Sequence, residues 1–201
     1  CNIPLILSTG TADGEEVEKA FNLLNKKTND VILLQCTSAY PSKFSEIDLR
    51  VIETFKKQYN CIVGFSGHEP GINVGISAAT LGAKVIEKHV TLNKKMNGTD
   101  HLASIDMDEL TALVNGIREI EKALGKETKQ KYKSEDVLVS ILGKSLATNK
   151  ALKAGSIIKK EDLIAKGPPT GISSQNYYEV LGKKILKDKE ADQILMPEEI
   201  E

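Results

Sequence analysis

The 201-residue sequence has almost no excess of charge of either sign. Its 27 lysine and arginine residues nearly balance 28 aspartate and glutamate residues, which gives a formal net charge of −1. A protein that binds nucleic acid or an acidic membrane surface through its overall charge needs a marked positive excess. We therefore expect no nucleic-acid partner, and any phosphate binding must depend on a local group of residues.

Long hydrophobic runs and a cysteine framework are also missing. No stretch reaches the roughly 18 consecutive apolar residues of a membrane span, and no basic and then apolar leader opens the chain. Three cysteines, Cys1, Cys36 and Cys61, are odd in number and far apart, and two of them stand within apolar runs. This pattern favours reduced, buried thiols over disulfides. We expect a cytoplasmic protein without a membrane partner.

What is present is an ordinary globular composition, with 40% hydrophobic and 27% charged residues. The length allows one large domain, or one medium and one small domain. An apolar run begins at Pro4, three residues after the first residue, Cys1. We therefore expect the sequence to enter its fold part-way through.

From Pro4 to Gly125, apolar runs alternate four times with amphipathic segments. This alternation is typical of a parallel sheet with crossover helices, and continuously apolar runs predict strands that are buried on both faces. Four strand and helix units make half of an eight-unit barrel. The strands are expected at residues 5–8, 31–36, 62–65 and 84–89.

Helix boundaries are marked by capping residues. Asp13 with Glu16, and Asp106 with Glu109, have the spacing of a capping box, and Gly125 is a typical stop signal. Apolar residues recur on one side of the first, second and fourth helices, as expected for packing against a sheet. They are Val17, Phe21 and Leu24; Leu49, Ile52 and Phe55; and Leu110, Leu113, Val114, Ile117 and Leu124. The third helix, expected at 72–81, is rich in Gly, Ser and Ala, which permits close approach to a sheet.

The composition changes abruptly after residue 125. Residues 126–134 are polar and rich in lysine, which predicts an exposed linker at 126–139, with a specific anion site as the alternative. Beyond it, glycine and proline turns separate short apolar runs at 139–142, 156–158 and 194–196. We expect a small, irregular, mostly β domain at 140–201.

Two histidines stand at the ends of neighbouring predicted strands. His68 follows the third strand and His89 ends the fourth. A lone loop histidine is more often structural, but the shared position favours a site. Adjacent strands lie about 4.8 Å apart, so both imidazoles could bind one ion at about 2.1 Å. Neutral imidazole suits Zn, Mn, Fe or Ni, so the two histidines do not identify the metal.

Other strand ends also carry polar groups. Asp100 is either a carboxylate of the same site or a turn aspartate that bonds its own backbone. His101 is a third candidate ligand, although a side chain next to Asp100 is expected to point elsewhere. Ser8 and Ser38, with nearby backbone amides, could hold a phosphate or cap helices. All these groups are expected at one edge of the sheet.

The strand-end motifs resemble the sialic acid synthase family in order and spacing. They are Ile6-Leu-Ser8-Thr-Gly10, Leu34-Gln-Cys36-Thr-Ser38-Ala-Tyr40-Pro41, Gly64-Phe-Ser66-Gly-His68-Glu69 and Ile86-Glu-Lys-His89-Val-Thr-Leu92. Residues 98–104 continue the likeness, and 143–145, 153–155, 158–163 and 170–173 resemble that family's SAF domain. The resemblance implies an α/β fold: the C-terminal half of a TIM (β/α)8 barrel at 1–125, followed by a mostly β SAF (β-clip, antifreeze-like) domain at 140–201.

The resemblance also implies a reaction. Phosphoenolpyruvate would condense with N-acetylmannosamine or its 6-phosphate, giving N-acetylneuraminate or its 9-phosphate and phosphate. A divalent cation, Mn or Mg, would be held by His68 and His89 and would activate the sugar aldehyde. Phosphoenolpyruvate would be contacted by Ser8, Ser38 and Ser66, the sugar pocket would be lined by Tyr40, and the substrate or a metal-bound water would be contacted by Asp100. A homodimer with exchanged SAF domains is expected.

Two positions depart from the bacterial pattern of the family. Gly67 stands where many bacterial members have aspartate, and the Ser66-Gly-His-Glu69 version resembles animal-type synthases that use a 6-phosphate sugar. Lys166 stands near the place of an arginine that reaches the partner subunit's sugar pocket, and would act there as a point charge without a bidentate fork.

Three alternatives remain open at the level of sequence. The first is a related synthase of legionaminic or pseudaminic acid. The second is another barrel enzyme that handles a sugar phosphate, and the third is a non-catalytic protein that binds carbohydrate or ice through its SAF domain. Because the first four strands of the barrel, with their lysines and acid/base glutamate, are absent from this sequence, we expect activity only together with an N-terminal half barrel.

Overall fold

The computed structural model describes residues 3–28 and 30–201. They form two compact units, of which the first ends at Glu127 and the second spans Thr128–Glu201. Cys36 is a buried free thiol, and Cys61 is a partly buried free thiol whose pKa is raised by burial. Cys1, the third expected thiol, lies outside the described residues.

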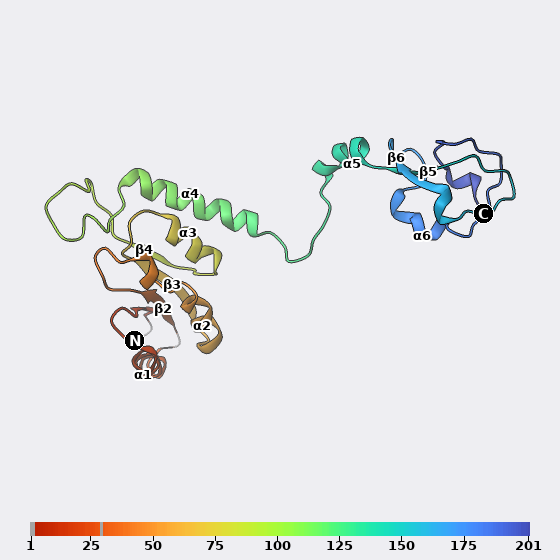
Figure 1. Cartoon of the computed structure of the whole chain (residues 1–201). Helices are drawn as coiled ribbons and strands as arrows, with labels where there is room; N and C mark the ends of the chain where they lie inside the picture. The colour runs from red at the N-terminus through yellow and green to blue at the C-terminus, as the bar shows by residue number, and fades with distance from the viewer. Residues whose placement is uncertain (1–2, 29) are drawn as a thin grey trace. The chain divides into compact units, whose positions relative to one another are not determined.

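In the first unit, four parallel strands alternate with four α-helices (Figure 1). The strands pair in chain order: β1 (Leu5–Ser8), β2 (Val31–Cys36), β3 (Ile62–Gly67) and β4 (Ile86–Lys88). The helices are α1 (Gly14–Asn25), α2 (Val51–Gln58), α3 (Asn73–Thr80) and α4 (Met107–Leu124), and a short 3-10 turn, η1 (Phe44–Glu46), precedes α2. A parallel sheet whose strand order follows the chain order confirms the predicted half of a TIM barrel.

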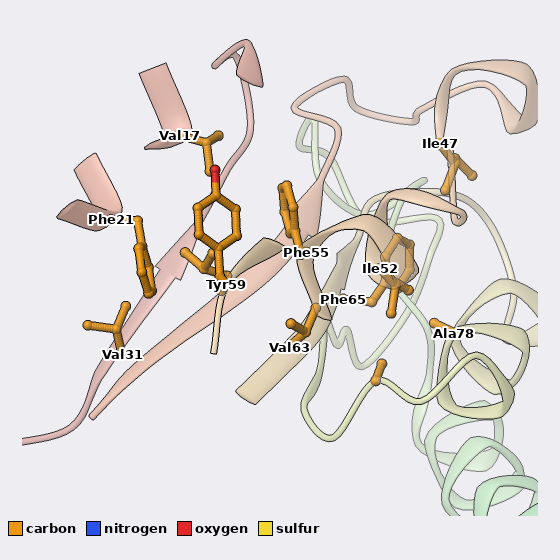
Figure 2. Packing of buried hydrophobic residues seen from close by; sticks show 12 residues of the cluster. Val17, Phe21, Val31, Ile47, Ile52, Phe55, Tyr59, Val63, Phe65 and Ala78 are labelled. Carbon is orange, nitrogen blue, oxygen red and sulfur yellow. The ribbon is translucent and has the colours of Figure 1, made fainter. Parts of the chain in front are cut away.

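One face of this sheet is covered by the helices. Residues of alternate position, such as Leu33 beside Val63, point to this face and are buried. Figure 2 shows Tyr59 between Phe21 of α1 and Phe55 of α2, with ring centroids 4.7 and 5.7 Å away. The cluster consists of Val17, Phe21, Val31, Leu33, Ile47, Ile52, Phe55, Tyr59, Val63, Phe65, Ala78 and Ala83.

The opposite face is only partly covered. Ile6 and Ile62 point to it and are 57% and 51% exposed. Leu34, Cys36 and Ser66 on the same face are buried. Leu34 has room because Gly64 lies on the next strand, where a Cβ would be 2.4 Å from Leu34 Cδ2. The expectation that the strands are buried on both faces is therefore confirmed for most of β2 and β3 and was wrong for β1 and β4. The helices of this chain supply cover for one face only.

The predicted helix signals are confirmed where they cap helices. Asp13 with Glu16, and Asp106 with Glu109, form capping boxes at the starts of α1 and α4. Gly125 ends α4 with a positive φ of 53°, a conformation that favours glycine. The predicted apolar stripe of α4 is less buried than expected, since only Leu113 of that helix is fully buried.

The second unit is small and irregular. Its regular elements are η2 (Lys133–Glu135), α5 (Asp136–Leu142), β5 (Ser145–Thr148), η3 (Lys160–Asp162), β6 (Leu163–Lys166), η4 (Ser174–Asn176), α6 (Tyr177–Val180) and η5 (Pro197–Glu199). β5 and β6 form an antiparallel pair, and isolated bridges join the remaining segments. The core consists of Leu146, Leu152, Ile158, Leu163, Ile172, Val180, Ile185 and Leu195.

Residues 139–142, expected as a short β run, instead form the last turn of α5. The apolar side chains of this helix are exposed, with Val137 and Ile141 both at 66%.

None of the helices in the described ranges is long and apolar enough to span a bilayer.

Candidate active site

The polar residues at the strand ends gather on the sheet face that the helices leave open. Side chains of a strand alternate between its faces, so residues two positions apart share a face. The register pairs Cys36 with Ser66, and Ser66 with Glu87, which places these three on the same face. Two positions further along, His68 and His89 follow Ser66 and Glu87 at the carboxyl edge of the sheet.

His68 is held firmly. It is 5% exposed, and its ring Nδ1 lies 2.9 Å from the backbone carbonyl oxygen of Thr37. Its own carbonyl oxygen accepts a hydrogen bond of 3.1 Å from the N–H of Ser42. When Nδ1 donates to Thr37, Nε2 carries the free lone pair, which is the usual arrangement of a metal-binding histidine.

His89 lies beside His68 and is more open. The two ring centroids are 5.2 Å apart, and the His89 side chain is 36% exposed. Asp100 Oδ2 lies 3.8 Å from His89 Nδ1. The ring of Tyr40 contacts both histidines, with centroid distances of 4.1 Å to His68 and 5.6 Å to His89. The structure therefore brings together four of the predicted site residues.

The loop between β4 and α4 carries Asp100 and extends away from the sheet before it returns (Figure 1). The Asp100 carboxylate accepts a hydrogen bond of 3.0 Å from the Thr99 hydroxyl, and it faces His89. His101, the third candidate ligand, points elsewhere as expected, because its Nδ1 lies 2.8 Å from the hydroxyl oxygen of Thr91.

The three predicted phosphate-binding serines differ in their surroundings. Ser38 is exposed and lies close against Gly10, where a Cβ would be 2.0 Å from its Oγ. Ser8 is exposed, on the same strand face as Gly10. Ser66 is 3% exposed, and its hydroxyl donates a hydrogen bond of 2.6 Å to Glu87 Oε1. A contact between Ser66 and a phosphate therefore requires its hydroxyl to turn away from Glu87.

Glu87 is a residue of this face that the sequence-based prediction missed. It is exposed, lies two residues before His89 and binds the Ser66 hydroxyl. The period of two along a strand was the signal that could have found it, since counting back from His89 gives the next side chain on the same face.

Lys166, the remaining predicted site residue, belongs to the second unit. Its ammonium group forms an ion pair with Asp192 of the same unit. The described structure therefore gives Lys166 an internal partner, and its predicted role at a sugar pocket stays a prediction.

The two imidazoles fit part of a metal site. Within residues 3–28 and 30–201, no group of three or more His, Cys, Asp or Glu side chains is placed to hold a metal ion. His68 nevertheless offers a free Nε2 next to the His89 ring. Mg²⁺ usually keeps several water ligands and binds few protein groups, so two protein ligands are compatible with an ion of that kind.

The fold and this polar group define a protein of the parallel α/β barrel type with its candidate site at the carboxyl ends of the strands. The NeuB family matches residues 1–129, and the SAF domain matches residues 143–201. The chain therefore belongs to the NeuB family, as the strand-end motifs indicated.

Similar proteins include synthases of legionaminic and N-acetylneuraminic acids. N,N'-diacetyllegionaminic acid synthase of Campylobacter jejuni is 42% identical over 96% of this chain and 59% of its own length. Human N-acetylneuraminate-9-phosphate synthase is 36% identical over 97% of this chain and 55% of its own length. The crystal structure of N-acetylneuraminic acid synthetase from Leptospira borgpetersenii, 35% identical, superposes with a TM-score of 0.61 over 69% of this chain and 49% of that one.

Proposed function

We propose that the protein containing this chain is a synthase that joins phosphoenolpyruvate to an N-acylated sugar aldehyde and releases phosphate. The observation that carries the proposal is the pair of imidazoles, 5.2 Å apart, at the ends of adjacent strands of a NeuB-family chain. The chain spans between 55% and 59% of the length of the two curated relatives described above. The complete activity is therefore proposed for the whole protein.

The reaction balances with water as the third reactant. Carbon 3 of phosphoenolpyruvate attacks the aldehyde carbon of the open-chain sugar and forms the new C–C bond. Water adds to carbon 2, and cleavage of the C–O bond at that carbon releases inorganic phosphate. The product is an acidic sugar with a ketone at carbon 2 and three more carbons than the acceptor.

In this proposal, His68 and His89 hold a divalent cation, Mn or Mg, through ring nitrogens. When bound, such a cation supplies Lewis-acid polarisation of an aldehyde oxygen. Tyr40 contacts both imidazoles and is 46% exposed, so its free ring surface is available to line the sugar pocket. Asp100, beside His89, accepts hydrogen bonds from substrate hydroxyls or from a water molecule.

Phosphoenolpyruvate is assigned to the neighbouring strand ends. The hydroxyls of Ser8 and Ser38 are exposed and would donate to a phosphate, although Ser38 Oγ also lies 3.9 Å from Cys36 Sγ. The missing Cβ of Gly10 leaves space for the Ser38 side chain, because a Cβ there would be 2.0 Å from Ser38 Oγ. Ser66 would join them once its hydroxyl turns from Glu87.

The acceptor sugar follows from subtracting the three carbons of pyruvate from the relatives' products. This leaves N-acetylmannosamine, its 6-phosphate, or the diacetamido six-carbon sugar that corresponds to diacetyllegionaminic acid. We propose N-acetylmannosamine or its 6-phosphate as the acceptor. The diacetamido sugar is the alternative, because the legionaminic acid synthase is the more identical of the two relatives.

Phosphate release with each acceptor tests the proposal. This chain, joined to the N-terminal remainder of the Campylobacter relative, is incubated with Mn²⁺, phosphoenolpyruvate and one of the three sugars, and inorganic phosphate is measured over time. We expect sugar-dependent release with one acceptor, and none from the 201-residue chain alone. Release that does not depend on any of the sugars, or full turnover by the chain alone, would contradict the proposal.

The proposed partner of this chain is a second copy that exchanges SAF domains with it. In that arrangement, Lys166 of one subunit is placed near the sugar pocket of the other. Light scattering on the joined protein is expected to give the mass of a dimer, and deletion of residues 128–201 is expected to give a monomer. A monomer in both cases would rule out the exchange.

A further inference from the structure

A buried ion pair links the residues directly adjacent to the two histidines. Lys88 precedes His89, Glu69 follows His68, and Lys88 Nζ lies 2.8 Å from Glu69 Oε1. The side chains of Lys88 and Glu69 are only 6% and 1% exposed. The same ammonium group also donates to the backbone carbonyl oxygen of Glu69. Buried lysine and glutamate are rare without such a partner.

The backbone ladder ends before it reaches the histidines. The last residue pair between β3 and β4 is Gly67 with Lys88. His68 and His89 each lie one residue beyond this pair, so ladder hydrogen bonds do not fix their separation. The link from Lys88 to the side chain and carbonyl of Glu69 is the contact that continues the connection between the two chain segments past the ladder.

The surroundings leave the Glu69 carboxylate dependent on Lys88. In the part of the chain that the structure describes, Glu69 Oε2 is buried and has no hydrogen-bond partner. Gly67 provides the space for the carboxylate, because a Cβ there would lie 2.6 Å from Oε2. An aspartate at 67 would place a second carboxylate in this space. The buried Lys88–Glu69 pair therefore requires glycine at position 67, because a larger residue would overlap the Glu69 carboxylate.

We propose that the Lys88–Glu69 pair is a positioning pair that sets the relative placement of the His68 and His89 imidazoles. The proposal deepens the proposed function, and it rests on that function only where a metal is concerned. His68 is already fixed by Thr37 and Ser42, so the pair chiefly ties the start of the His89 segment to the fixed His68 segment.

The test removes both charges together. In Lys88→Met with Glu69→Gln, no charge is left buried alone, and neutral replacement of a buried pair is often tolerated. The matched control is Lys19→Met with Glu15→Gln, an exposed lysine and glutamate pair on α1. Both double variants are made in the 201-residue chain, and folding is checked by circular dichroism and thermal melting.

Two measurements are made on each variant. The first is Mn²⁺ affinity by electron paramagnetic resonance, for which we expect a loss of about 10-fold or more in the Lys88/Glu69 double variant and none in the control. The second, without metal and at one fixed pH, follows the imidazole proton resonances. These are sensitive to the Tyr40 ring, 4.1 and 5.6 Å away, and we expect both to shift while His101 stays unchanged.

The outcomes separate this inference from the proposed function. If the unmodified chain binds no Mn²⁺, the metal part of the proposed function fails, and the metal-free resonances still decide the positioning role. Unchanged His68 and His89 resonances in the folded double variant would overturn the inference. If that variant does not fold, Lys88→Arg keeps the charge but lengthens the link. Lys88→Arg is expected to shift the His68 and His89 resonances. If these resonances do not change in Lys88→Arg, the inference is overturned.

Discussion

Replacing His68 or His89 by alanine is expected to lower kcat/KM for sugar-dependent phosphate release by about 10³-fold in the joined protein. A loss of this size corresponds to about 4 kcal/mol of transition-state stabilisation, which is the scale of Lewis-acid activation of a carbonyl group. The reason is geometric, since each imidazole is one half of a site in which the rings are 5.2 Å apart. Either single variant should therefore lose nearly as much as the double variant.

The matched control is His101→Ala, a histidine of the same loop region whose Nδ1 is bound to Thr91. It should retain activity within a few-fold, because its ring is directed away from the His68 and His89 pair. Measurement of Mn²⁺ affinity on the same variants separates metal loss from misfolding. Equal losses in all three variants, or full activity in His68→Ala, would contradict the assignment of the site.

The sheet of the first unit was predictable because its strands are short, continuously apolar and bounded by turn residues. The predicted bounds 5–8 and 31–36 agree with β1 and β2. The fourth strand is shorter than predicted, Ile86–Lys88, although the N–H of Lys84 still donates to the Val63 carbonyl oxygen. The assigned end of a strand depends on where its hydrogen-bonded pairing with the neighbouring strand becomes regular, so predicted and observed ends differ by one or two residues.

The segment 139–142 was predicted wrongly because four apolar residues do not distinguish a helix from a strand. Extending the window by two residues toward the N-terminus adds Val137 and Leu138. Their spacing to Ile141, four and three residues, suits the helix that α5 forms. Burial gave no guidance in this case, because the apolar side chains of α5 are exposed.

The site was predictable only where local sequence determines it. The ends of the predicted strands located His68 and His89. Glu87 was missed, although alternation along the strand would have been enough to identify it. The contact between Lys88 and Glu69 depends on the register that pairs Gly67 with Lys88, and on the space left by the missing Cβ of Gly67. The sequence of a single strand gives neither the register nor this space, so Lys88 and Glu69 were not recognised as a pair.

In the second unit, Glu199 is the residue on which acid stability is expected to depend most. It is 4% exposed, and its Oε2 accepts hydrogen bonds of 2.7 Å from Lys189 and 2.9 Å from the N–H of Met196. Its Oε1 lies 2.8 Å from Lys187 Nζ. Burial alone would raise the pKa of Glu199, but the hydrogen bonds from Lys187, Lys189 and Met196 outweigh it and lower the pKa from 4.5 to about 2.

A carboxyl group whose pKa is lower in the folded state stabilises the fold when it is ionised. The contribution of Glu199 is thus fully present above pH 4.5 and is lost as the pH falls toward about 2. We expect it to be about 2 kcal/mol, which is below the full value of the pKa difference because the exposed Lys187 is screened by solvent. Asp162 and Asp188 also have lowered pKa values and change stability in the same direction, so a comparison with a variant is needed.

Glu199→Gln provides that comparison, because glutamine does not titrate and leaves Lys189 buried without its counter-charge. At pH 6 the variant is expected to be less stable than the unmodified chain by about 2 kcal/mol or more, since breaking a buried pair is strongly destabilising. The difference should shrink steadily below pH 4.5 as Glu199 itself becomes protonated. Urea unfolding, followed through the amide signals of the buried residues Leu146 and Leu195, measures it in this unit. Glu161→Gln, at an exposed position of the same unit, is the control and should change stability little at any pH. If the stability difference between Glu199→Gln and the unmodified chain stays constant from pH 6 to pH 2, ionisation of Glu199 is not its source.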